Sequence, residues 1–143
     1  MKRLIVALMF AIAGTGWGYS QVAAKALPVF DIHKPTIVAF FPHVTDAEME
    51  SNPDTNEALS DFQLYAGAAG KPLREAGIDF QLADTRSFTI RSGSKVRTFH
   101  TGKIGIGYYF IAPGKKPHVE YGVMVDADIL DVAGKYFGIA IKR

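Results

Sequence analysis

A short apolar run between two prolines constrains the fold of this chain more than any other feature. Thr36 to Phe41 reads TIVAFF, and Pro35 and Pro42 stand directly on either side of it. A segment this short between prolines does not make a stable helix, whereas β-branched and aromatic side chains favour extended backbone. A continuous apolar run of this length is typical of a strand buried on both faces. The sequence therefore predicts a fold of the α/β class with this segment as a buried strand.

Residues 42–56, after this strand, are the most polar stretch of the chain and are expected to form an irregular loop. A helix is predicted to follow. Ser51, Asn52 or Asp54 can cap the helix, and Pro53 suits its first position. Further along, apolar residues recur every three or four positions, which is typical of a helix with one buried face. These residues are Leu59, Phe62, Ala66, Ala69 and Leu73.

A second strand follows this helix. Gly70 and Pro72 predict a kink or break near residue 70, and Gly77 predicts the C-terminal end of the helix. Residues 78–82 then alternate apolar and polar side chains, as in a half-buried strand. A strand, a helix and a strand in this order form a right-handed crossover, so the two strands are expected to be parallel neighbours.

The rest of the chain predicts two hairpins and a last helix. Strands on either side of Ser92–Ser94 form the first hairpin, and strands on either side of Pro113–Pro117 form the second. Asp126 is expected to cap the last helix and Gly138 to end it. Before all of these, residues 27–32 are expected to form a short edge strand.

Composition places this chain among globular, cysteine-free proteins. With 143 residues, of which 48% are hydrophobic, it is long enough for one domain with its own core and too apolar for a disordered chain. It contains no cysteine, which excludes disulfides, thiol chemistry, thiolate metal sites and a lipid anchor on an N-terminal cysteine.

The first 24 residues have the layout of a bacterial secretory signal peptide. Lys2 and Arg3 precede an apolar run that starts at Leu4, and small residues suited to cleavage end at Ala24 and Ala26. The run is too short to cross a bilayer comfortably, so we expect cleavage and no stable membrane span afterwards. Residues 25–143 then form a single domain, located in the periplasm or outside the cell.

The two signs of charge are separated along the chain. The full sequence has 16 basic and 14 acidic residues, and removal of Lys2 and Arg3 with the signal peptide makes the two numbers equal. Residues 46–61 carry acidic side chains without a basic one, whereas residues 86–116 carry basic side chains without an acidic one. This separation predicts either two solvated faces that attract each other or a charged patch for a partner.

The order of elements resembles the thioredoxin-like superfamily. The resemblance covers residues 30–140 and is strongest in the second hairpin, where residues 107–114 and 119–124 resemble the fourth and fifth thioredoxin strands, and in the last helix. It implies a mixed central sheet with a βαβ unit, an inserted hairpin, a C-terminal β-hairpin and a helix.

Both redox elements of that superfamily are missing here. Pro42-His43-Val44-Thr45-Asp46 stands where thioredoxins carry Cys-x-x-Cys, and Gly105-Ile106-Gly107 stands where they carry a cis-proline. The resemblance therefore implies a redox-inactive member of the class, and its function has to be argued from its own residues.

Other kinds of chemistry have little support in the sequence. The four histidines are not spaced as a metal-binding pair, and the acidic residues of 46–50 lack the pattern of a calcium loop. Gly105-x-Gly107 lacks the third glycine of a dinucleotide site and indicates positive φ or close backbone approach instead. Phe88 and Phe99 in the basic hairpin fit core positions better than base stacking. We expect no cofactor, no metal and no nucleic-acid partner.

The leading hypothesis is an exported, non-catalytic, thioredoxin-like binding or accessory protein whose partner is an unknown envelope protein or small ligand. Its binding residues are expected at the loops on the carboxyl side of the sheet. Two alternatives stay open: a small cofactor-free enzyme that uses His43 and Asp46 for acid–base chemistry, and a structural or small-molecule-carrying envelope protein. The candidate binding residues are His43, Thr45, Asp46, Gly105, Gly107, Tyr108 and Gly122.

Overall fold

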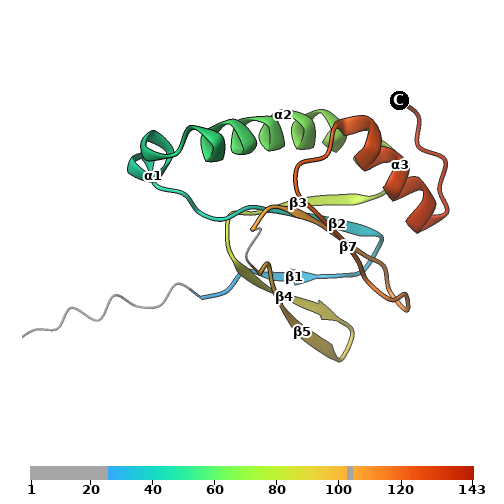
Figure 1. The fold of residues 1–143 in the computed structure, drawn as a ribbon. Helices are drawn as coiled ribbons and strands as arrows, with labels where there is room; N and C mark the ends of the chain where they lie inside the picture. Colours follow the sequence, from blue (N-terminus) through green and yellow to red (C-terminus); the bar gives the residue numbers. More distant parts are fainter. Residues whose placement is uncertain (1–25, 103–104) are drawn as a thin grey trace, which may run out of the picture.

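The computed structural model describes residues 26–102 and 105–143, which fold into two mixed sheets and three helices (Figure 1). The predicted signal peptide, residues 1–24, lies outside the described residues. In chain order the elements are β1 (Val29–Asp31), β2 (Thr36–Phe40), α1 (Asp46–Ser51), α2 (Pro53–Glu75), β3 (Asp79–Ala83), β4 (Ser87–Ser92), β5 (Lys95–His100), β6 (Gly107–Ile111), β7 (His118–Tyr121) and α3 (Asp126–Phe137).

The four-stranded sheet has the order β3-β2-β6-β7. β2 runs parallel to β3 and antiparallel to β6, and β6 runs antiparallel to β7. All five residues of β2 are buried. The prediction of a buried strand at Thr36–Phe41 with a parallel neighbour after the helix is confirmed.

The helices α2 and α3 cover one face of this sheet (Figure 1). The predicted stripe of α2 is confirmed, since Leu59, Phe62, Ala66, Ala69 and Leu73 are all buried. Together with side chains of β2, β6 and α3 they form the first core. Burial of this stripe is the main source of stability for a helix of this length.

The predicted break near residue 70 is wrong, because α2 continues through Pro72 to Glu75. Pro72 lies in the last turn, where its missing N–H removes one helical hydrogen bond, while the next residue, Leu73, is fully buried in the core. Gly70 is buried, and a β-carbon there would be 3.0 Å from Nη1 of Arg74 and 3.5 Å from the ring of Phe80. The contact with Phe80 is an ordinary one, and the tighter contact is with the side chain of Arg74 on the same helix.

Three of the predicted helix ends are confirmed. Asn52 caps α2, since its side chain accepts a hydrogen bond from the N–H of Thr55. Gly77, with φ of +80°, follows the end of α2, and Gly138, with φ of +68°, ends α3. Asp126 was expected to cap α3, but it is the first helical residue; Val125 occupies the cap without a side-chain hydrogen bond.

The second sheet has the order β1-β4-β5 and covers the other face of the four-stranded sheet. β4 and β5 form the predicted antiparallel hairpin, and β1 lies at the edge of this sheet, parallel to β4. The expectation of one central sheet is therefore corrected to two packed sheets. Both faces of β2 are covered, by helices on one side and by this sheet on the other, which explains why its sequence is apolar throughout.

Aromatic rings fill the space between the two sheets. The ring of Phe99 lies 5.1 Å from Phe88 and 5.3 Å from Phe40, measured between centroids. Phe88 is fully buried, and Phe99 packs against the same cluster. The interpretation of these two residues as core is confirmed.

Candidate functional site

The carboxyl end of β2 opens into a surface hollow of about 560 Å³. The chain leaves β2 through Phe41 and Pro42 and reaches His43 before α1 begins. Gly105 and Ile106, directly before β6, line a second side, and the start of α2 lines a third. The residues that line the hollow are Pro42, His43, Val44, Glu48, Ser51, Asn52, Asp54, Thr55, Ala58, Arg86, Gly105 and Ile106. Of the seven candidate binding residues, His43 and Gly105 line this hollow directly.

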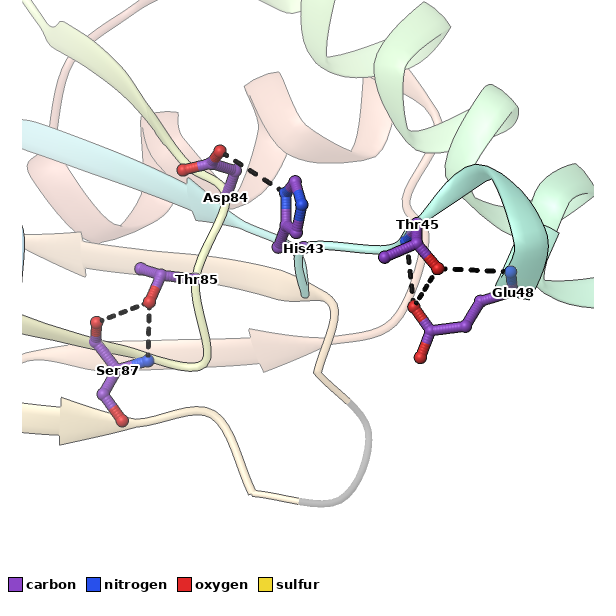
Figure 2. Close-up of polar contacts among 6 residues, drawn as sticks. All are labelled: His43, Thr45, Glu48, Asp84, Thr85 and Ser87. Atoms are coloured by element: carbon purple, nitrogen blue, oxygen red, sulfur yellow. Dashed lines mark hydrogen bonds and ion pairs between the residues drawn. The ribbon is translucent and has the colours of Figure 1, made fainter. Parts of the chain in front are cut away.

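His43 faces Asp84 and not Asp46 (Figure 2). Nδ1 of His43 is 4.0 Å from Oδ2 of Asp84, and the two side chains are 75% and 51% exposed. This distance is that of a loose ion pair between solvated groups, which orients the imidazole only weakly. Asp46 is the first residue of α1 and has no hydrogen bond or ion pair with His43. The proposed pair of His43 with Asp46 is therefore absent from the described residues.

Thr45 is engaged in the cap of α1 (Figure 2). Its hydroxyl and its backbone N–H both donate to Oε2 of Glu48 at 2.9 Å, and the N–H of Glu48 donates back to Oγ1 of Thr45 at 3.3 Å. The hydrogen bond from the Thr45 backbone, then that from its hydroxyl, lowers the pKa of Glu48. This capping box begins α1 within residues 42–56, so the prediction of an irregular loop over these residues is wrong at Asp46–Ser51.

The glycines of the candidate site hold backbone segments close together. Gly105 has φ of +75°, and a β-carbon there would lie 3.4 Å from the ring of Pro42. Gly122 has φ of +99°, and its N–H donates to the carbonyl of Ile106 at 2.9 Å. The expectation of positive φ or close approach around Gly105 and Gly107 is confirmed.

Tyr108 belongs to the core and does not line the hollow. It is fully buried, and its ring lies 5.4 Å from that of Phe62 on the helix-covered face. Burial raises the pKa of Tyr108 to about 12, and the backbone of Met124 opposes this rise only in part. Its hydroxyl has no hydrogen-bond partner of normal geometry within the described residues. A ligand in the hollow does not reach this side chain.

Three charged residues at this end were not among the predicted site residues. Asp84 directly follows β3, Arg86 precedes β4, and Glu48 lies on α1. The charge of Arg86 contributes to the low pKa of Glu48, although the two make no ion pair. The place of Asp84 could have been inferred from the parallel pairing of β2 and β3, because carboxyl ends of parallel strands meet at one edge.

The hollow offers hydrogen bonds and charge but no assembled catalytic group. Within residues 26–102 and 105–143, no group of three His, Asp or Glu side chains is placed to hold a metal ion. The hydroxyl of Ser51, which lines the hollow, donates to the carbonyl of Glu48. Among the described residues it makes no hydrogen bond to a side chain that could act as its base, which is the pairing that an activated serine nucleophile needs.

Fold and site together define a mixed α/β protein with two packed sheets and an open polar hollow at one sheet end. Comparisons of the chain with family models, curated proteins and solved structures gave no match. No helix in the described part of the chain combines the length and apolar character that a bilayer crossing requires.

Proposed function

We propose that this chain is an exported, non-catalytic binding module of thioredoxin-like architecture, which recognises an envelope protein or small ligand at the hollow around His43. The observation that carries the proposal is the position of this hollow at the carboxyl end of β2 and β3, where open α/β sheets bind their ligands.

The arrangement of strands supports the thioredoxin-like part of the proposal. β2, α2 and β3 form a parallel βαβ unit, and an antiparallel hairpin, β6–β7, and a final helix follow it. The inserted hairpin, β4–β5, pairs with β1 in a separate sheet. This sheet departs from the expected single central sheet but leaves the order of the remaining elements intact.

The chemistry of the hollow favours binding over catalysis. The segment Pro42–Asp46 stands where a redox member carries Cys-x-x-Cys, and the chain contains no cysteine at all. His43 is largely exposed and only loosely paired, and Thr45 is engaged in a helix cap. An exposed imidazole beside Glu48 and Arg86 suits a polar partner surface, since both signs of charge are within reach.

The export part of the proposal rests on residues 1–24 of the sequence. Cleavage after Ala24 or Ala26 would leave every described strand and helix intact, because β1 begins at Val29. N-terminal sequencing of the protein isolated from its own cells tests this part. A mature chain that begins at Lys25 or Leu27 supports export, and a chain that retains Met1 overturns it.

Site-specific photo-crosslinking tests the binding site. A photoreactive amino acid replaces His43 in one variant and Lys135, an exposed residue on α3, in the matched control. We expect one discrete adduct in intact cells from position 43, absent at position 135 and abolished by the additional change Arg86→Glu. Equal adducts at both positions, or none at position 43, would contradict the proposal.

A further inference from the structure

A second, strongly basic cleft lies at the opposite end of the sheets. β6 runs from Gly107, beside the hollow around His43, to Ile111, where the new cleft begins. The cleft lies between the β4–β5 hairpin and the β6–β7 turn, which Figure 1 shows at the same end of the molecule. Its volume is about 260 Å³, and its lining residues are Ile90, Ser92, Lys95, Arg97, Ile111, Ala112, Gly114, Lys115, Lys116 and Pro117.

The cleft gathers four cations and no carboxylate. Lys95 and Arg97 come from β5, and Lys115 and Lys116 come from the turn after β6. Lys95, Arg97 and Lys116 take part in no ion pair among residues 26–102 and 105–143. Four cations that line one cleft create a positive electrostatic potential, which attracts and binds an anion.

Among the residues that the structure describes, the acidic segment of the chain makes no ion pair with the four cations of the cleft. The acidic residues of 46–61 belong to α1 and α2, whereas the cleft is lined by the β4–β5 hairpin and the β6–β7 turn. Figure 1 shows α2 and the β4–β5 hairpin on opposite sides of the four-stranded sheet. Within the described part of the chain, no ion pair joins residues 46–61 to residues 86–116. The sequence left two interpretations of the charge separation open: two faces that attract each other, or a charged patch for a partner. This arrangement favours the charged patch.

One of the four cations is held in place by the protein itself. The ammonium of Lys115 donates to the backbone carbonyl oxygen of Tyr136 and lies 4.5 Å from the centroid of the aromatic ring of Tyr136. The hydroxyl of Tyr136 donates in turn to the carbonyl of Lys116 at 2.9 Å. These contacts tie the turn to α3, so one wall of the cleft is preorganised and loses little entropy when a ligand binds.

Size and lining define the class of ligand. The volume lies just below the range of about 300–1,000 Å³ that is usual for sites of drug-sized ligands, so its size suits one small group. The guanidinium of Arg97 matches the oxygens of a phosphate in two parallel hydrogen bonds, and lysines add charge. Ile90 and Ile111, nearly fully buried, give the cleft an apolar floor.

We propose that this cleft binds a phosphoryl group that carries a small organic substituent. The four cations hold the phosphate oxygens, Ser92 contributes a hydroxyl, and the apolar floor contacts the substituent. The same chemistry occurs in soluble phosphate esters and in the headgroups of anionic phospholipids. Nucleic acid is disfavoured, since Phe88 and Phe99 are packed in the core and offer no surface for base stacking.

The test measures two probes against the purified protein. Glycerol 3-phosphate is titrated while backbone amide signals are followed by NMR, and vesicles of phosphatidylglycerol in phosphatidylcholine are sedimented with the protein. We expect saturable shifts at Ser92 and Gly114, in opposite walls of the cleft, with millimolar or tighter affinity. Binding of the ester alone assigns a soluble ligand, and additional sedimentation with anionic vesicles assigns a headgroup.

Matched variants separate this cleft from nonspecific charge. Lys95→Gln with Lys116→Gln removes one cation from each wall, and Lys135→Gln with Lys142→Gln removes two exposed lysines elsewhere. We expect at least tenfold weaker binding in the first pair and less than twofold change in the second. Arg97→Lys keeps the positive charge but removes the guanidinium that can donate two parallel hydrogen bonds to a phosphate. We therefore expect a loss of affinity between those of the two lysine pairs. His43→Ala leaves binding unchanged, which keeps this test independent of the function proposed above.

Two outcomes would overturn the proposal. One is the absence of binding to either probe in the unmodified protein. The other is an equal loss of affinity in both lysine pairs, which would show attraction to overall charge and not to the cleft. All changed side chains are exposed, so thermal unfolding of each variant is expected to match that of the unmodified protein and serves as the check on folding.

Discussion

The carbonyl oxygen of Glu120 occupies the space that a β-carbon at Gly107 would need. An ideal β-carbon built on Gly107 lies 2.3 Å from this oxygen and 2.7 Å from Cζ of Phe40. The cause is close packing and not a special backbone angle, since φ of Gly107 lies outside the positive range. Gly107 begins β6 and pairs with β2 on one side and β7 on the other, so the contact fixes three strands beside the hollow around His43.

Gly107→Ala is therefore expected to destabilise the fold. The obstructing atom is backbone, which moves only if β6 and β7 separate, and overpacking of this kind costs about 2 to 3 kcal/mol. Urea denaturation of both proteins measures the difference in the free energy of unfolding. An unchanged midpoint would show that the strands relax without cost.

Gly67→Ala is the matched control and is expected to have the opposite effect. Gly67 is exposed on α2, and a β-carbon there meets nothing within 4 Å. Alanine restricts the unfolded chain and favours helix, so the variant gains about 0.5 to 1 kcal/mol in the same denaturation experiment. A loss of stability would indicate that α2 is not helical at this position in solution.

The sequence predicted the elements whose signal is local. The apolar run of β2 and the stripe of α2 fixed a buried strand and an amphipathic helix, and handedness then made β2 and β3 parallel. α1 was missed although Thr45 and Glu48 have capping-box spacing, because its short helix has no buried residue and therefore no apolar stripe. The second sheet was missed because β1 pairs with β4 across about 60 residues, and local pattern does not encode such a partner.

The sequence predicted where the candidate site lies better than it predicted which residues contact each other there. Sequence placed His43 and Gly105 at the carboxyl end of β2, and both line the hollow there. It did not name Asp84, although the predicted parallel pairing of β2 with β3 brings the residues after both strands to the same edge of the sheet. It also placed Tyr108 in the site, whereas strand alternation sends this side chain into the helix-covered core.

Alkaline unfolding is expected to depend on Tyr108. The unfolded chain releases this proton near pH 10, whereas burial keeps it in the native state up to about 12. The native state then holds more protons, so stability is complete below pH 10 and falls as pH rises towards 12, on the order of 1 kcal/mol per pH unit. Tyr108→Phe should flatten this fall and be neutral or stabilising at pH 7, since it removes an unpaired buried hydroxyl. Denaturation at pH 7, 10 and 11 measures both effects, and an identical alkaline slope in the two proteins would contradict the assignment.

Thr45→Ala is expected to loosen α1 without unfolding the protein. The change removes the hydroxyl that accepts from the N–H of Glu48, and loss of such a cap costs a helix about 1 kcal/mol. Because α1 has no buried residue, we expect faster amide hydrogen exchange over residues 46–51 with little change in the midpoint of global unfolding. Thr45→Ser keeps the hydroxyl and should exchange like the unmodified protein. Acid should act in the same direction as the alanine variant. The ionised carboxylate of Glu48 holds the cap of α1, which is why its pKa is lowered, and this stabilisation is lost as pH falls through the lowered pKa. Exchange that is equally fast in the alanine and serine variants would show that the hydroxyl has no part in holding α1.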